Sequence, residues 1–204
     1  MTTQSRRQQA ERRSETEAKL IDATIQCIID IGYQRVSVRE ICQRAGVSHG
    51  GLFGRFNTLF ALIAAAAVTA GQRLTAEFTA ALAALPAGAD LDATLELLRD
   101  NARVPTNKVW IELNIAARTD PALREHMAVA RAEYGAAIVA HTVTLPVAAG
   151  VPPEALVTVG SIVLQYFDAS AITAAAFPTP EQDRAELAAF TTMVHAYLDS
   201  VRTG

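Results

Sequence analysis

The stretch VSVREICQRAGVSHGGLFGRF, residues 36–56, decides the fold, because it predicts two short helices joined by a tight turn. Ser37 is followed three residues later by Glu40, the spacing of a capping box, and therefore predicts the start of the first helix. Gly46 is expected to end that helix after two turns. Ser48 is the N-cap candidate for a second short helix, residues 49–56.

The turn between these helices has the residue sizes that a helix-turn-helix requires. Ala45 and Gly46 are small at the point where the two helices are expected to cross, and Val47 is expected to fill the gap between them. A longer helix, with apolar residues at helical spacing from Thr16 to a stop at Gly32, precedes them. The pattern predicts a helix-turn-helix over residues 37–56. Three helices of this size bury too little to stand alone, so they are expected to pack on the helix that follows.

The composition extends this helical prediction to the whole chain. Of 204 residues, 40 are alanine and only 8 are proline and 11 glycine, which favours an all-α fold. Six further helices are expected after the helix-turn-helix. Proline and glycine residues separate them, and Asp90 and Asp120 are the expected N-caps of two of them. Their expected ranges are 58–85, 90–103, 105–118, 120–145, 153–177 and 179–202.

Several classes of protein are disfavoured by what the sequence lacks. The first twenty residues have no apolar core of a signal peptide, and the longest uncharged apolar run, residues 59–70, is too short to span a bilayer. Cys27 and Cys42 have no His or Cys cluster near them, so we expect reduced, semi-buried thiols and no metal site. No Gly-rich phosphate loop, paired histidine motif or G-x-S-x-G occurs. We therefore expect a cytoplasmic protein that is not an enzyme, carries no cofactor and contacts no membrane.

Charge is divided unevenly along the chain. Residues 1–60 carry nine Lys and Arg against six Asp and Glu, a net of +3, whereas residues 61–204 carry nine against fifteen, a net of −6. A basic end on an acidic body can approach a polyanion with that end only. Residues 1–14, with Arg6, Arg7, Arg12 and Arg13, are expected to form a flexible basic arm. The arm is either a solvated tail or a phosphate contact.

Residues 36–56, followed by Leu59 and Leu62, resemble the DNA-binding domain of the TetR family of bacterial repressors. That family typically carries T-x-x-x-I-A-x-x-A-G-V-S-x-G-x-L-Y-x-Y-F and then K-x-x-L. With the preceding helix, the resemblance covers residues 15–62. The positions that match in type and spacing are Ser37, Ile41, Ala45, Gly46, Val47, Ser48, Gly50, Leu52, Phe56 and Leu62.

The resemblance also implies which residues contact DNA. Arg39 would face the major groove, where its guanidinium could bind guanine, and His49 could meet a base or a phosphate. A phosphate contact or a merely solvated side chain is an equally open role for both. Gly51, Phe53 and Leu59 replace the Thr, Tyr and Lys of the family, which removes two hydroxyls and one cation that typically hold phosphates. The full set of expected DNA contacts is Arg39, Arg44, Ser48, His49, Gly50, Gly51, Phe53 and Arg55.

For the rest of the chain, residues 63–204, the resemblance implies a ligand-binding and dimerisation domain. Its last two helices would pair with those of a second copy, and a small, largely apolar effector would bind in the interior. Candidate ligand contacts are Trp110, Asn114, Met127, Tyr134 and Gln165, although core or dimer packing explains each of them as well. The expected function is a homodimeric repressor, released from a palindromic double-stranded operator by that effector. The alternative is a dimeric small-molecule binding protein whose head has weak or lost operator affinity.

Overall fold

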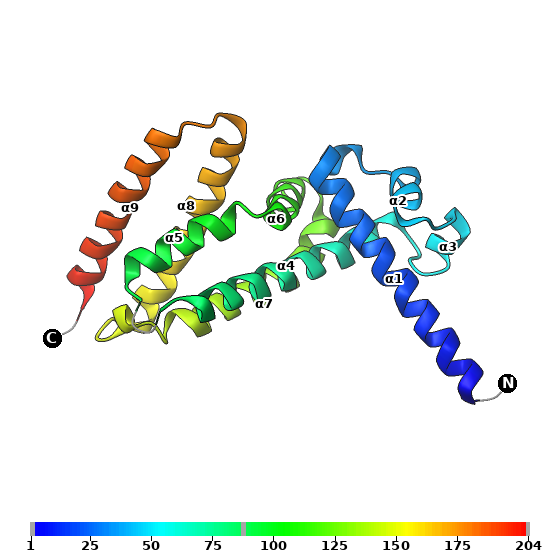
Figure 1. Ribbon diagram of the computed structural model, residues 1–204, viewed down its shortest axis with the longest axis horizontal. Coiled ribbons are helices and arrows are strands. Elements are labelled where there is room, and N and C mark those ends of the chain that lie inside the picture. The colour runs from blue at the N-terminus through cyan, green and yellow to red at the C-terminus, as the bar shows by residue number, and fades with distance from the viewer. Residues whose placement is uncertain (1–2, 87–88, 203–204) are drawn as a thin grey trace. The chain divides into compact units, whose positions relative to one another are not determined.

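The computed structural model of the protein describes residues 3–86 and 89–202. Residues 1–2, 87–88 and 203–204 lie outside this description, and with them the first two residues of the expected arm and part of the expected break between helices 58–85 and 90–103. The described residues form nine α-helices, two 3-10 turns and no strand, which confirms the expected all-α fold (Figure 1).

The helices follow one another with short connections. In chain order they are α1 (Thr3–Ile31), η1 (Tyr33–Arg35), α2 (Val38–Ala45), α3 (His49–Phe53), α4 (Leu59–Ala84), α5 (Leu91–Ala102), α6 (Pro105–Ala116), α7 (Pro121–Thr142), η2 (Pro146–Ala148), α8 (Pro153–Ala176) and α9 (Pro180–Val201). Helices α4 to α9 begin and end within three residues of the sequence expectation.

Capping residues account for this agreement. The carboxylate of Asp90 accepts a hydrogen bond from the Ala93 backbone N–H at 3.0 Å at the start of α5. The carboxylate of Asp120 accepts from the Leu123 N–H at 3.0 Å at the start of α7. Such side-chain acceptors satisfy N–H groups that have no partner inside the helix, and they mark its start in the sequence.

Helix α1 begins at Thr3, well before the first apolar position of its repeat. Residues 7–15 are exposed and form no apolar face, so hydrophobic periodicity carries no signal there. Ala, Arg, Gln and Glu dominate this stretch and have high intrinsic helix propensity. The flexibility of the arm in solution stays a prediction.

The chain divides into two compact units, each described here by itself. The head unit comprises residues 1–73 and 105–131, and the body unit comprises residues 74–104 and 132–204. The expected boundary between residues 62 and 63 separates a DNA-binding segment from a ligand-binding segment, and it stays a prediction.

The helix-turn-helix of the head unit is built around a small apolar core. Leu62 of α4 belongs to this core, which confirms that the first three helices pack on the one that follows. Both cysteines are free and buried in it, and burial raises the pKa of both thiols. The buried members are Leu20, Ala23, Cys27, Ile41, Cys42, Leu52, Phe56 and Leu62.

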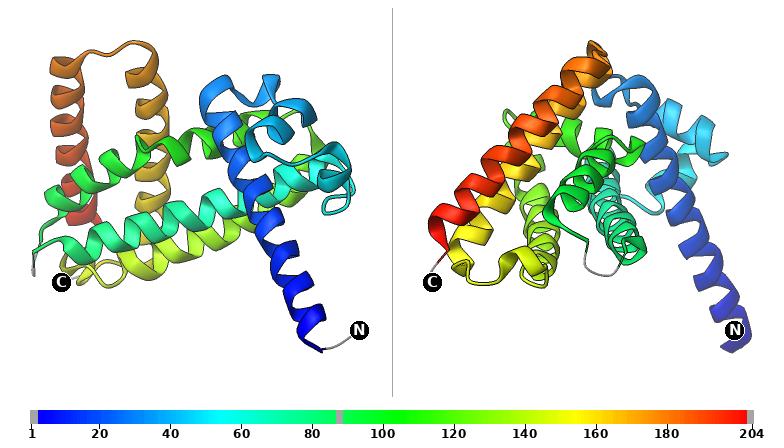
Figure 2. Two further views of the ribbon diagram at one scale, coloured as in Figure 1. Left: turned by 45° about the vertical axis from the view of Figure 1, so that its right-hand side comes forward. Right: turned by 60° about the vertical axis from the view of Figure 1, so that its left-hand side comes forward.

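The core of the body unit is formed mainly by α5, α8 and α9. Helices α8 and α9 run antiparallel beside each other (Figure 2), and Tyr166 stacks on Phe190 with ring centroids 3.9 Å apart. The guanidinium of Arg103, at the end of α5, donates to the carboxylate of Asp183 in the first turn of α9. His195 of α9 also lies 2.6 Å from the Asp92 carboxylate of α5, so aliphatic packing, aromatic contacts and polar side-chain pairs together hold these three helices.

Two helices, Leu59–Ala84 and Pro153–Ala176, are long and apolar enough to cross a membrane by length and composition alone. Core helices of soluble proteins pass the same test, and parts of both helices are buried in the cores described above. Packing accounts for the apolar character of α4. It accounts for only part of that of α8, which also carries exposed apolar side chains.

Candidate nucleic-acid interface and ligand pocket

Two serine caps define the helix-turn-helix. The Ser37 hydroxyl accepts from the Glu40 backbone N–H at 3.2 Å, and the Ser48 hydroxyl accepts from the Gly51 N–H at 3.1 Å. Gly46 has φ 64° and ψ 31°, the left-handed conformation that glycine adopts without strain. A Cβ at Gly46 would meet no atom within 4 Å. The expectation that Gly46 is small to let helices cross is therefore wrong, since its backbone conformation is the reason for glycine.

Close packing occurs one turn further on, between Val47 and Gly51. A Cβ at Gly51 would lie 2.7 Å from Cγ1 of Val47 and 3.3 Å from the Ser48 hydroxyl. Val47 thus fills the gap between α2 and α3, as expected from the sequence, and it occupies the space that a side chain at Gly51 would need. The Thr that the family has at this position would not fit here without a shift of Val47.

Most of the expected DNA contacts on α2 and α3 are exposed to solvent. Arg39 and His49 are exposed near the N-terminal ends of their helices, and Phe53 is 48% exposed. Arg44 is held in an ion pair with Asp30 of α1 at 2.7 Å, so its guanidinium would have to be shared with a phosphate. Gly50 and Ser48 are exposed beside His49. Their contact with DNA stays a prediction.

Arg55 lies just after α3 and is the least accessible of these arginines. Its Nη1 donates to the Gly54 carbonyl at 3.2 Å, while its Nε is buried and has no hydrogen-bond partner among the described residues. The hydrogen bond to Gly54 thus ties the guanidinium to the end of α3.

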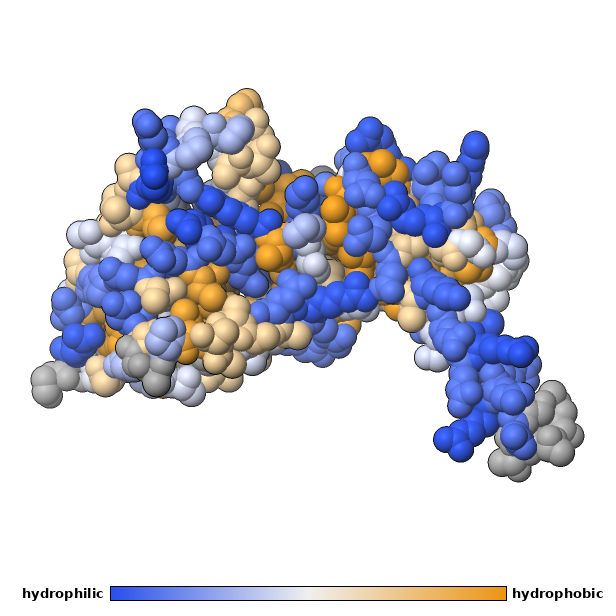
Figure 3. All heavy atoms as spheres, in the orientation of Figure 1, coloured by the Kyte–Doolittle hydropathy of each residue, from blue (hydrophilic) through white to orange (hydrophobic). Residues whose placement is uncertain are grey.

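The N-terminal half of α1 presents an almost wholly hydrophilic surface (Figure 3). Arg12 and Arg13 are exposed, and Arg7 forms a loose exposed ion pair with Glu11 at 3.6 Å. Exposed pairs of this kind contribute little to stability, so these guanidinium groups can exchange a carboxylate for a phosphate at small cost.

A carboxylate that sequence reasoning missed ties α6 to the connection between α1 and α2. The Glu112 side chain accepts a hydrogen bond from the Tyr33 backbone N–H. Its oxygens also lie 3.4 and 3.6 Å from the place where a Cβ on Gly32 would be, and Gly32 has φ 78°. No spacing rule links residues 79 positions apart, so the sequence held no signal for this contact.

The five expected ligand contacts fall in different places. Trp110 and Met127 are buried in the head unit, with the Trp110 ring 3.4 Å from a Cβ placed on Gly71. Asn114 donates to the Trp110 carbonyl at 2.8 Å and accepts from Arg131 at 2.7 Å. In the body unit, burial and the nearby Asp168 carboxylate raise the pKa of Tyr134 to about 12, and exposed Gln165 donates to Ser161 at 3.0 Å.

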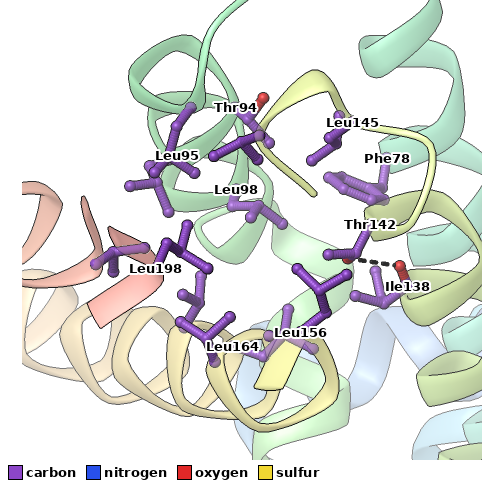
Figure 4. A pocket seen from close by; sticks show the side chains of 16 residues that line it. Phe78, Thr94, Leu95, Leu98, Ile138, Thr142, Leu145, Leu156, Leu164 and Leu198 are labelled. Carbon is purple, nitrogen blue, oxygen red and sulfur yellow. Dashed lines mark hydrogen bonds between the residues drawn. The ribbon is translucent and has the colours of Figure 1, made fainter. Parts of the chain in front are cut away.

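A cavity of about 50 Å³ lies inside the body unit (Figure 4). Among the described residues, none of the five expected ligand contacts lines it. Its walls come from the end of α4, from α5, from α7 and its following loop, and from α8 and α9. The lining residues are Phe78, Leu91, Thr94, Leu95, Leu98, Ile138, Thr142, Leu145, Val147, Leu156, Val159, Gly160, Val163, Leu164, Val194 and Leu198. Such residues look like ordinary core in a sequence, which is why the cavity could not be predicted.

Comparisons with known proteins agree with this architecture. Residues 20–66 match the family model described as bacterial regulatory proteins, tetR family. The chain is 37% identical over 193 residues to the HTH-type transcriptional regulator Rv2912c of Mycobacterium tuberculosis, covering 94% of this chain and 99% of that protein. A transcriptional regulator from Rhodococcus has a similar structure, with a TM-score of 0.69, 25% identity and coverage of 92% and 98% of the two chains. The multidrug binding protein EbrR, solved with imidazole, shares the fold at a TM-score of 0.60 and 24% identity, covering 84% and 92%.

A helix-turn-helix head on an all-helical body defines a DNA-binding protein of the HTH class. The chain belongs to the TetR family of HTH-type transcriptional regulators. This is a family of DNA-binding regulators and not of enzymes.

Proposed function

We propose that this regulator is a cytoplasmic homodimeric repressor, which a small, largely apolar ligand releases from a palindromic operator. The capped helix-turn-helix, with Arg39 and His49 exposed at the N-terminal ends of its helices, carries the proposal. His49 lies at the N-terminal end of the second helix, whose first residues reach base edges when such a motif enters the major groove. The family resemblance implies a groove-facing position for Arg39 as well. Arg39 is proposed to read a base, and Arg44, Arg55 and the arm are proposed to hold phosphates.

Exposed apolar side chains on α8 and α9 support the homodimer. Val157, Ile162 and Ile172 on α8 are about half exposed, and Met193 on α9 is 60% exposed. Apolar residues gathered on two neighbouring helices are typical of a surface that a second chain covers. A twofold dimer would carry two heads to two half-sites, so a palindromic operator follows from its symmetry.

Selection from random-sequence DNA at about physiological salt tests operator binding. We expect an enriched inverted repeat that withstands competition by unselected DNA. Arg39→Ala should weaken binding to the repeat by about 1–3 kcal/mol and leave unselected DNA almost unaffected. If the folded protein enriches no sequence, the alternative function gains support, with Gly51, Phe53 and Leu59 as the marks of a disabled head.

Light scattering on a pair of variants tests the dimer. Ile162→Glu places a charge on the proposed interface and should give monomers, whereas Val129→Glu alters an equally exposed residue of the head unit and should leave dimers. The monomeric variant should also bind the inverted repeat at least tenfold more weakly, because its two heads are no longer linked. Dimers that persist in Ile162→Glu would place the interface elsewhere.

A further inference from the structure

Helix α3 has one buried face and one exposed face. Leu52 is fully buried and, with Phe56 just beyond the helix, belongs to the core of the helix-turn-helix. His49, Gly50 and Phe53 are exposed. Positions 49 and 50 lie four and three residues before position 53, so these three residues share one face of the helix. Because the core holds the Leu52 side inward, the exposed face is the one that α3 can turn toward DNA in the major groove.

Phe53 is the largest side chain on this exposed face. The side chain is 48% exposed, and Gly50, one turn before it, has no side chain to shield the ring. A Cβ added at Gly50 would meet no atom within 4 Å, so the surface beside the ring is open. Single exposed apolar residues are ordinary on a protein surface, so exposure alone assigns no role to Phe53. Its place among the expected DNA contacts is what gives the ring a partner to explain.

The chemistry of the phenyl ring decides which part of DNA it can bind. The tyrosine that the family typically carries at this position has a hydroxyl that can donate to a phosphate, and phenylalanine has no such donor. A phosphate oxygen placed against the ring would lose hydration and gain no hydrogen bond. The apolar group that the base pairs present in the major groove is the C5 methyl of thymine, and phenylalanine packs against it.

We infer that Phe53 packs against the C5 methyl of a thymine in each half-site of the operator, and that it determines specificity instead of holding a phosphate. The inference rests on the proposed function and deepens it, because it names one base that each half-site contains. Adenine, guanine and cytosine present no such methyl group, so the ring selects thymine at that position.

Replacing thymine by uracil tests the inference, because uracil lacks the C5 methyl and keeps every hydrogen-bonding group of thymine. Each thymine of the selected inverted repeat is replaced in turn, and binding of the full chain is measured by fluorescence anisotropy. We expect one thymine per half-site at which uracil weakens binding about fourfold, the effect of leaving one methyl group unburied. Replacing that thymine in both half-sites should weaken binding by about the square of this factor.

Variants of Phe53 show whether its ring is what reads the methyl. Phe53→Ala should bind the thymine and uracil operators equally, because no side chain then reaches the methyl group. Phe53→Leu keeps an apolar side chain and should keep a uracil penalty of about twofold or more. Ile115→Ala is the matched control, because Ile115 is 52% exposed in the same unit and lies on α6. This control should keep the full penalty of about fourfold.

Photocrosslinking gives a second measurement on the unaltered protein. An operator with 5-iodouracil at the responsive thymine carries iodine in place of the methyl group, and irradiation joins that base to an aromatic side chain in contact with it. We expect the crosslinked peptide to contain Phe53. The result identifies the contact even if Phe53→Ala fails to fold.

The inference is overturned if no thymine responds to uracil, if the penalty persists in folded Phe53→Ala, or if the crosslink forms on another residue. Phe53→Tyr gives a further contrast. Stronger binding of this variant to selected and unselected DNA alike would place the ring against a phosphate, and it would also overturn the inference. Failure of the proposed function looks different, because selection then enriches no inverted repeat and the inference falls with it.

Discussion

At the scale of single residues, each of the three glycines near the start of α3 occupies its position for a different structural reason. Gly46 adopts a left-handed backbone, Gly51 faces the Val47 side chain, and Gly50 is open to solvent. The sequence alone treats Gly50 and Gly51 as equal costs to a short helix. Only the tertiary structure shows that Gly51 is needed for packing against Val47.

Gly50→Ala and Gly51→Ala should therefore change stability in opposite directions. Gly50→Ala should raise the free energy of unfolding by about 0.5–1 kcal/mol, because alanine favours the helix and meets no neighbour. Gly51→Ala should lower it by about 1–3 kcal/mol, because its Cβ forces Val47 to move. Urea denaturation of both variants measures the two values. Equal effects would mean that α3 repacks freely around Val47.

The ion pair between Arg103 and Asp183 gives the body unit a defined response to acid. The hydrogen bond from Arg103 lowers the pKa of Asp183 below its ordinary value of 3.8. The folded state then binds fewer protons than the unfolded chain, so this stabilisation is present above pH 3.8 and is lost as the pH falls through the lowered pKa.

Asp183→Asn should lower the free energy of unfolding at pH 7 by about 0.5–1 kcal/mol, and it should flatten the decline in stability below pH 4. Asp199→Asn is the control, because its ion pair with Arg202 is exposed and joins residues of the same chain end. Urea titrations at a series of pH values between 7 and 2 measure both effects. A decline below pH 4 as steep as in the unaltered protein would contradict this assignment.

At the scale of elements, the contact between Glu112 of α6 and the η1 turn joins two segments of the head unit that are far apart in the sequence. We expect Glu112→Ala to lower the free energy of unfolding by about 1–2 kcal/mol, because the part-buried Tyr33 N–H loses its acceptor. Glu112→Gln keeps an acceptor oxygen and should recover most of that loss. Hydrogen exchange at the Tyr33 amide should accelerate in the alanine variant alone. An unchanged exchange rate in Glu112→Ala would exclude the contact.

These elements also show what a single sequence can and cannot predict. Helix starts at Asp90 and Asp120 were predictable, because capping is a local interaction between residues three positions apart. The helix-turn-helix was predictable for the same reason. The Glu112 contact and the cavity depend on tertiary packing between distant segments, and the early start of α1 depends on propensity without an apolar face. The residue assignments for DNA and ligand stay predictions.

At the scale of the whole molecule, the distribution of charge sets how binding depends on salt. Under the proposed function, a chain of net charge −3 approaches DNA with residues 1–60, which carry +3, and we expect the arginines of the arm to supply much of the attraction. Each phosphate that a cation neutralises releases counterions, and it lowers log K by about 0.9 per unit of log salt concentration.

Replacing Arg6, Arg7, Arg12 and Arg13 together by glutamine should reduce this slope by about 0.9 for every phosphate that the arm contacts. Glutamine keeps a polar residue of good helix propensity, so the variant changes charge with little effect on α1. Fluorescence anisotropy with the selected operator, between about 50 and 300 mM salt, measures the slope. The preference for the operator over unselected DNA should be unchanged, since phosphate contacts position the protein and base contacts specify it. An unchanged slope would show that the arm is a solvated tail, and the phosphate contacts would then fall to Arg44 and Arg55.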